Sequence, residues 1–183
     1  PPPGVCGTSE SNPVASPPNQ KRAAMCLVNA VRKKAGVGSL QASTCETGHP
    51  LTVCINPGPS QPRVGRMYGA AYQKALDVYR CPQPNGAPGW VHTACGRPMD
   101  YWINKFGYAT GCSSWAWGEN IYTGFGRPSN TVRAAVNWWL NSPGHRANLL
   151  KREWTDQGIA FVRGSFLGHP DAVIWVSLFG RCG

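Results

Sequence analysis

The sequence has few carboxylates and no long apolar segment. Only eight residues are Asp or Glu, against 18 Lys and Arg, so the formal net charge is +10 at pH 7. No stretch approaches the roughly 18 apolar residues of a transmembrane helix, so we predict no membrane span. The chain opens on PPPGVCG, without a basic start or an apolar run. We therefore predict a mature, secreted, extracellular chain from which a signal peptide has been removed.

Several motifs of catalysis and of nucleic-acid binding are also missing. No G-x-S-x-G, Walker or H-E-x-x-H motif occurs, and no two cysteines are spaced C-x-x-C. The basic residues are not accompanied by an RNA-binding motif or zinc-finger spacing, so we expect no specific nucleic-acid partner. The charge indicates either a solvated basic face or adhesion to an anionic membrane or wall polymer.

The eight cysteines predict a domain stabilised by four disulfides in an oxidising compartment. Loop length favours Cys45 with Cys54 and Cys81 with Cys95. Cys6 with Cys26 and Cys112 with Cys182 would then remain.

Hydrophobic periodicity predicts an α+β domain. We assign residues 1–18 to a Pro/Ser-rich N-terminal lead and 19–183 to a single domain, monomeric by default. Helices are expected from residue 19 to about 36, over 63–81 and 99–108, over 129–141 with Ser129 or Asn130 as N-cap, and from 143. Strands are expected over 117–123, 157–164 and 172–180. Helices first and antiparallel strands last favour a layered α+β fold.

The stretch Ser142-Pro143-Gly144-His145 interrupts a tryptophan-rich helix. Pro143 should end that helix near Asn141 and occupy the first position of the next one, with Ser142 as N-cap. His145 then lies in the first turn, where the helix dipole disfavours the imidazolium form. We predict a neutral His145 that accepts a hydrogen bond or binds a metal, although packing alone would also explain it.

Glu119 is unusual because it lies in an apolar, aromatic strand, SWAWGENIY, where a charge needs a partner. The natural partners are His92 and His145, since His49 and His169 stand beside Pro in predicted exposed loops. Two His and one Glu could bind a divalent metal such as zinc, with an open fourth position, or polarise a water. Trp117 and Tyr122 either stack on a ligand or belong to the core.

Five segments, in this order, resemble the CAP superfamily of cysteine-rich secretory proteins, venom antigen 5 and plant pathogenesis-related proteins. They are HT at 92, GENIYTG at 118, WWLNSPGHRANLL at 138, DQGIAF at 156 and WVSLFG at 175. The SPGHRANLL form is similar to the bacterial branch. The resemblance implies a three-layer α/β/α sandwich around a small antiparallel sheet, and secretion.

The resemblance also implies a cavity with two His and two Glu, onto which His92, Glu119 and His145 match. The second Glu falls near Asn141 or Ser142 and is absent, so zinc binding through the remaining three residues should be weak. We name Trp117, Tyr122 and Asn141 as candidate ligand contacts.

The resemblance does not fix one activity. We predict a secreted binding module whose His/Glu cavity holds a small, apolar or metal ligand, such as a lipid, a sterol or a cell-surface molecule. The alternative is a hydrolase of esters, peptides or wall glycans, with a metal- or His-activated water and Glu119 as general acid or base. A glycan hydrolase would need a second carboxylate, Asp100 or Asp156. A purely structural or toxin-like interaction protein is the third possibility.

Overall fold

A four-stranded mixed sheet forms the centre of the molecule. The computed structural model describes residues 2–43, 57–83 and 89–183. The sheet order is β1-β3-β4-β2, and its strands are β1 (Gln41–Ala42), β2 (Trp115–Phe125), β3 (Asp156–Phe166) and β4 (His169–Cys182). The three long strands are antiparallel, as predicted. The sheet is not purely antiparallel, because the chain leaving the first helix places the two-residue β1 parallel to the start of β3.

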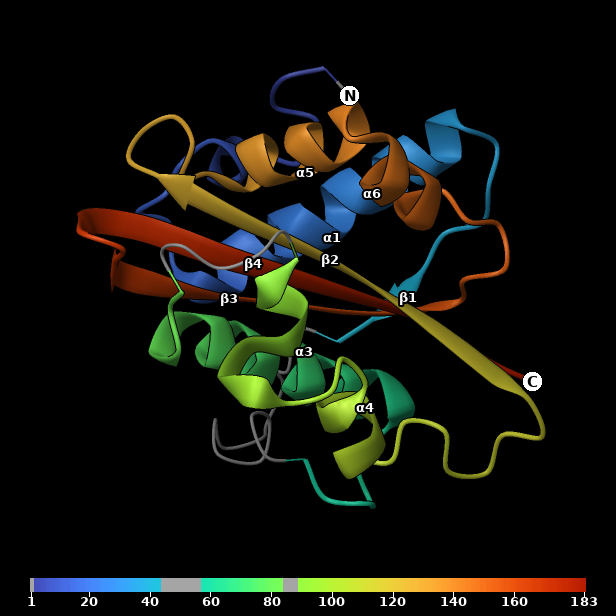
Figure 1. Cartoon of the computed structure of the whole chain (residues 1–183). Coiled ribbons are helices and arrows are strands. Elements are labelled where there is room, and N and C mark those ends of the chain that lie inside the picture. Colours follow the sequence, from blue (N-terminus) through green and yellow to red (C-terminus); the bar gives the residue numbers. More distant parts are fainter. Residues whose placement is uncertain (1, 44–56, 84–88) are drawn as a thin grey trace.

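Helices cover both faces of this sheet, which confirms the three-layer sandwich (Figure 1). One layer contains α1 (Pro17–Lys34), α5 (Val132–Asn141) and α6 (Pro143–Leu149). The other contains α3 (Arg63–Arg80), α4 (Tyr101–Lys105) and the 3-10 segment η2 (Trp90–Gly96), while η1 (Thr8–Glu10) lies in the N-terminal lead. In the described part of the chain, no helix combines the length and apolarity needed to cross a membrane.

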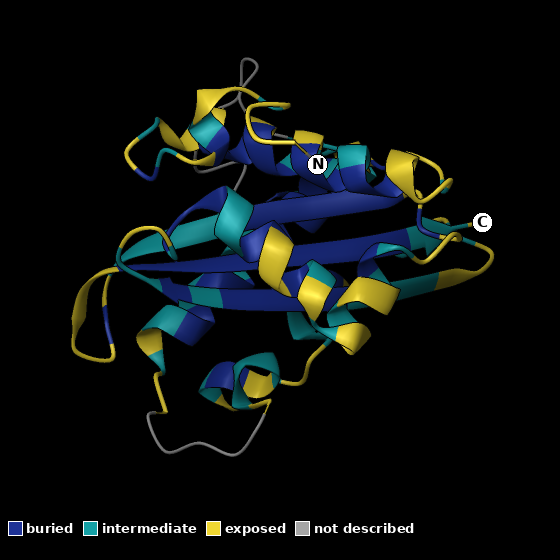
Figure 2. Cartoon of the chain, turned by 90° about the horizontal axis from the view of Figure 1, so that it is seen from above, coloured by how far each residue is buried: buried dark blue, intermediate teal, exposed yellow. Residues whose placement is uncertain are grey.

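Strand alternation divides the core into two clusters, one on each face of the sheet, and the strands between them are largely buried (Figure 2). Ile121 of β2 packs with Met67 and Ala71 of α3. The next residue, Tyr122, packs on the opposite face with Leu27 of α1 and Trp139 of α5. The apolar stripes predicted for α1 and α3 are therefore the faces that these helices bury.

Helix starts differ slightly from the predictions. The helix after β2 is capped by Thr131 rather than by Ser129 or Asn130, because the Thr131 hydroxyl accepts a hydrogen bond from the Ala134 backbone N–H at 3.2 Å. The first helix begins at Pro17, with the proline in the first turn. The break at Pro143 is confirmed, since α5 ends at Asn141 and α6 begins at Pro143.

Three of the four predicted disulfides are confirmed, namely Cys6–Cys26, Cys81–Cys95 and Cys112–Cys182. Cys45 and Cys54, and with them His49, lie outside the described residues.

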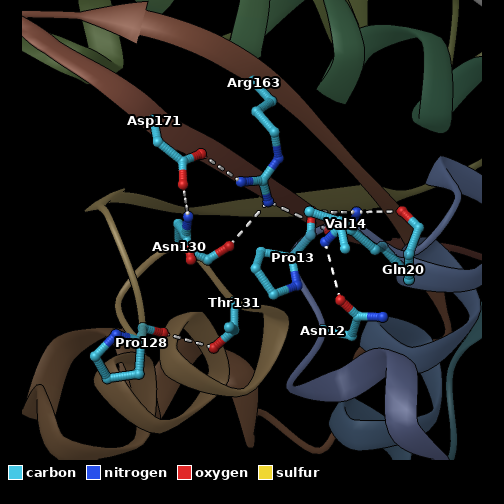
Figure 3. A network of polar contacts seen from close by, with 10 residues as sticks. Asn12, Pro13, Val14, Gln20, Pro128, Asn130, Thr131, Arg163 and Asp171 are labelled. Atoms are coloured by element: carbon cyan, nitrogen blue, oxygen red, sulfur yellow. Dashed lines mark hydrogen bonds and ion pairs between the residues drawn. The ribbon is translucent and has the colours of Figure 1, made fainter.

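Polar contacts attach the N-terminal lead to the layer of α1 and α5. The buried Glu10 carboxylate accepts hydrogen bonds from the Gly4 and Cys6 backbone N–H groups and pairs with Arg133 of α5. A second network surrounds Arg163 of β3, whose guanidinium donates to the Asn130 carbonyl at 2.9 Å and to Asp171 at 3.1 Å (Figure 3). Both networks join segments that are distant in the sequence.

Candidate functional site

The structure brings His92, Glu119 and His145 together at the outer edge of β2. His92 comes from η2 in one helical layer, Glu119 from β2 itself and His145 from α6 in the other layer. Two adjoining pockets, of about 430 and 320 Å³, follow this edge, and both are lined by His92 and His145. We call the two pockets together the β2-edge groove.

The orientation of His92 is set by a carboxylate behind its ring. His92 Nδ1 donates to Glu119 Oε1 at 2.6 Å. The other ring nitrogen, Nε2, takes no part in this hydrogen bond. The Glu119 side chain is 1% exposed and that of His92 is 27% exposed. Glu119 therefore positions the imidazole, and His92 is the member of the pair that a ligand can reach.

A buried lysine that the sequence reasoning missed completes this arrangement. Lys74 of α3 is 2% exposed, and its ammonium donates to the His92 backbone carbonyl and lies 4.0 Å from Glu119 Oε2. Burial lowers the pKa of Lys74, while the nearby Glu119 carboxylate opposes this shift. The available signal was its place on the apolar stripe of α3, three residues after Ala71 and four before Val78.

His145 is held from the opposite side of the groove. Its Nδ1 is 2.7 Å from the Ser142 hydroxyl, and its ring centroid is 4.7 Å from that of Trp138. Burial and the charge of His92 lower the pKa of His145. The lowered pKa agrees with the predicted neutral imidazole. Its causes are burial and His92, rather than the helix dipole expected from the sequence. Ser142 occupies the N-cap position as predicted, although its hydroxyl contacts the ring and caps no backbone N–H.

A partly buried amide network holds α6 against β2. Asn120 Nδ2 donates to the His145 carbonyl at 2.9 Å, and Asn148 Nδ2 donates to Asn120 Oδ1 at 3.0 Å. A Cβ at Gly118 would lie 2.4 Å from Asn148 Oδ1, so the absence of a side chain there makes room for Asn148. Each residue of Gly118-Glu119-Asn120 thus has its own task at the site.

The predicted ligand contacts have three different locations. Tyr122 lines the larger pocket of the groove, and its hydroxyl donates to the Ser129 carbonyl at 2.8 Å. Trp117 packs against the core cluster on the α3 face. The structure does not bring Asn141 into the groove, because it is exposed and lines a separate depression between α1 and α6. The sequence reasoning overlooked Trp138, which is 46% exposed and lines the groove.

The other candidate residues lie elsewhere. Asp156 accepts a hydrogen bond from the buried Tyr108 hydroxyl at 2.8 Å, and Asp100 accepts one from Asn104 at 2.8 Å. Neither lines the groove beside Glu119. His169 is exposed, as predicted, but lies in β4 rather than in a loop, with its ring centroid 4.3 Å from that of Phe125.

The donor set of the groove does not fit a zinc site with three protein ligands. Residues 2–43, 57–83 and 89–183 contain no group of three or more His, Cys, Asp or Glu side chains that could hold a metal ion. The Glu119 carboxylate is occupied by His92 and Lys74, so it lies behind His92 rather than beside the two imidazoles. From the described residues, the groove offers one imidazole nitrogen each from His92 and His145.

The three-layer α/β/α sandwich, with His92 and His145 at the sheet edge, is the fold that the sequence resemblance implied. The model of the cysteine-rich secretory protein family, CAP, matches residues 68–179, and the chain belongs to this family. Among curated proteins, none matches the chain by sequence.

Solved structures share the fold at low sequence identity. An outer surface protein of Borrelia burgdorferi is similar with a TM-score of 0.60 and 18% identity, over 90% of this chain and 93% of that chain. An extracellular protein of Bacillus anthracis that contains an SCP domain gives 0.53 and 17%, over 91% and 44%. A cysteine-rich secretory protein of Staphylococcus aureus gives 0.52 and 14%, over 92% and 40%. This chain thus spans less than half of the latter two proteins.

Proposed function

We propose that the protein is a secreted or surface-located binding module that holds a small amphipathic ligand in the β2-edge groove. The observation that carries this proposal is the pair of imidazoles fixed from opposite walls of an open groove. Glu119 and Lys74 fix His92, and Ser142 fixes His145. The named neighbours include an outer surface protein and an extracellular protein, which supports the location.

The chemistry of the groove favours a ligand with an apolar body and one polar group. Val91, Ile121 and Trp138 provide apolar surface along the larger pocket. The neutral His145 can exchange a hydrogen bond with a hydroxyl or a protonated carboxyl group, as found in sterols and lipids. Fixed rings also reduce the side-chain entropy that is lost when a ligand binds.

Equilibrium dialysis with two defined probes, dehydroergosterol and dansyl-undecanoic acid, tests this proposal. Trp138→Ala and His145→Ala should each weaken binding of the preferred probe by about tenfold, corresponding to roughly 1.4 kcal/mol. Trp115→Phe is the matched control, because Trp115 is also exposed (37%) but does not line the groove. Equal binding by all four proteins, or no binding of either probe, would contradict the proposal.

One observation favours hydrolysis as a second candidate function. With Nδ1–H held by Glu119, His92 carries its acceptor lone pair on Nε2, which is the arrangement of a general base. Glu119 would then be a positioning residue rather than the general acid or base. Release of p-nitrophenol from p-nitrophenyl acetate should fall at least a hundredfold in His92→Gln if this activity exists, and equal rates would exclude His92 as the base.

We also propose that His92 and His145 bind zinc with low affinity. Two imidazole nitrogens without a carboxylate ligand should bind zinc weakly, and binding should decrease on acidification as the imidazoles protonate. Calorimetry with zinc on the wild type and His145→Ala checks this, since equal heats would place any bound zinc outside the groove.

A further inference from the structure

The edge of β2 presents backbone hydrogen-bonding groups to the groove at regular intervals. Within the described residues, β2 is an edge strand of the sheet and pairs with β4 alone. Before the strand, Ser114 and Gly183 exchange backbone hydrogen bonds of 3.2 and 2.8 Å; after it, the Gly126 N–H donates to the Asp171 carbonyl at 2.8 Å. The register between these two points is unbroken.

This pairing fixes which residues of β2 face outward. In an antiparallel pair, alternate residues direct both N–H and C=O toward the partner strand, and the others direct them away. Because Ser114 and Gly126 face β4, so do the even-numbered residues between them. The odd-numbered residues Glu119, Ile121 and Thr123 therefore direct their N–H and C=O groups out of the sheet.

The outward-facing groups border the groove, and only one has a protein partner among the contacts of the described residues. The two pockets are lined by every residue from Gly118 to Thr123. The Ile121 carbonyl accepts a hydrogen bond from Trp139 Nε1 at 3.3 Å, which independently supports its outward direction. The remaining backbone groups of Glu119, Ile121 and Thr123 are available at the ladder spacing of a strand, roughly 6.8 Å between alternate residues.

The charge of the groove is also informative. Among the described residues, no Lys or Arg lines either pocket, and the one formally charged lining residue, Glu119, is paired with Lys74. The groove is thus close to neutral within a chain of charge +10. Such a site complements the uncharged main chain of a peptide and does not complement an anionic polymer.

We propose that the β2-edge groove binds an extended peptide segment of about six residues, which adds to the sheet as a strand beside β2. This inference goes beyond the proposed small-ligand function and assigns a peptide as a further occupant of the same groove. The added strand continues the hydrogen-bonded ladder that joins β4 to β2. A neutral glycan could use the aromatic rings, but it does not match three backbone donors at strand spacing.

The two walls determine which side chains the peptide would carry. Successive residues of an added strand point alternately to the η2 wall, with Val91 and His92, and to the α5/α6 wall, with Trp138 and His145. We expect aromatic or β-branched residues toward Trp138, because its ring is exposed and lies tilted against the ring of Tyr122 at a centroid distance of 5.8 Å.

The test uses a pool of N-acetylated, C-amidated hexapeptides that alternate Thr with Val, Ile, Tyr or Phe. Amide hydrogen exchange is followed by NMR with and without the pool. We expect exchange of the Ile121 and Thr123 amides to slow at least tenfold. A second pool, N-methylated at every other residue, keeps the side chains but cannot form the ladder, and it should give no protection.

Two variants provide an independent check. Thr123→Pro removes one outward N–H at an edge position where proline is tolerated, and it should weaken binding about tenfold. Thr123→Val keeps the backbone donor and should bind like the wild type. Equal protection by both pools would overturn the inference, as would no protection by the first pool. If the sterol or lipid probe still binds in the second case, only the peptide inference fails; if neither binds, the proposed function fails as well.

Discussion

At the scale of single residues, the site keeps its charges behind the surface that a ligand meets. Lys74 and Glu119 have side chains that are 3% and 1% exposed, whereas His92 lies in front of them with 27% of its side chain exposed. Buried charges are costly unless they are paired, so this arrangement requires both residues at once.

A double-mutant cycle tests this coupling. Glu119→Gln leaves Lys74 buried without its nearest carboxylate and should lower the free energy of unfolding by roughly 3 kcal/mol. Lys74→Met should be destabilising for the converse reason. The double variant should lose less than the sum of the two, as measured by urea unfolding. Additive losses would show that the two charges act independently.

His145 gives a pH dependence with a definite sign. Burial and His92 hold its folded pKa below the ordinary value of 6.5. The unfolded chain therefore binds a proton at a higher pH than the folded chain, so stability should fall as the pH is lowered from 7 through 6.5. His145→Gln should reduce this slope in urea unfolding between pH 7 and 5. An NMR titration midpoint for His145 above 6.5 would contradict the assignment.

At the scale of elements, the position of α6 depends on close packing over one glycine. Asn148 lies over Gly118 and bonds to Asn120, which holds the first turn of α6 and with it His145. Gly118→Ala should displace Asn148, lower stability by about 1–3 kcal/mol and weaken probe binding. Gly144→Ala is the matched control for stability, since a Cβ at Gly144 meets no atom within 4 Å. Equal thermal midpoints for the two variants would show that this packing is unimportant.

The N-terminal lead should detach in acid. Burial raises the pKa of Glu10, but hydrogen bonds from Gly4, Arg133 and Cys6 outweigh it, so the net pKa is lowered. A carboxyl group with a lowered folded pKa stabilises the structure above its unfolded value of about 4.3, and this contribution is lost as the pH falls through the folded value. The protection factors of the Gly4 and Cys6 amides, which compare measured exchange with the intrinsic rate at the same pH, should fall below pH 4. Glu10→Gln should show this loss of protection already at pH 7.

Much of this fold follows from patterns within single elements, whereas the details of the site depend on contacts between them. Helical periodicity predicted the helix over 63–81, and its apolar residues Met67 and Ala71 are buried in the core. Lys74 was missed, because periodicity within one helix cannot show that Glu119, in a strand 45 residues later, lies beside it. The convergence of His92, Glu119 and His145 was expected from family resemblance. Asn141 lies outside the groove because α5 buries Val132, Val136 and Trp139, and its last residue is exposed to solvent.

At the scale of the whole molecule, ion pairing leaves an excess of basic groups at the surface. Six described carboxylates pair with Lys or Arg side chains: Glu10, Asp77, Glu119, Glu153, Asp156 and Asp171. Lys33 and Lys34 at the end of α1, Arg146 in α6 and Arg152 just after it are exposed basic residues, and Lys34 and Arg146 line the same depression. This surface is separate from the neutral β2-edge groove.

We expect the basic surface to bind anionic vesicles. Vesicles that contain phosphatidylglycerol should retain the protein at low salt, and retention should fall steeply as salt is added. Lys33→Glu with Lys34→Glu should reduce retention more than Arg80→Glu with Arg127→Glu, which changes the net charge equally at exposed sites elsewhere. Equal retention by both pairs, or equal binding to neutral vesicles, would contradict a localised electrostatic surface.

The fully buried Arg32 imposes a different kind of limit on the chain. Its guanidinium donates to four backbone carbonyls, those of Gly38, Leu149, Lys151 and Trp154. Because every acceptor is main chain, exchanging side chains at Lys151 or Arg152 leaves these bonds unchanged. Inserting or deleting one residue between α6 and β3 would move several acceptors together. Related chains that keep this arginine are therefore free to vary in composition along this connection, but its length is fixed.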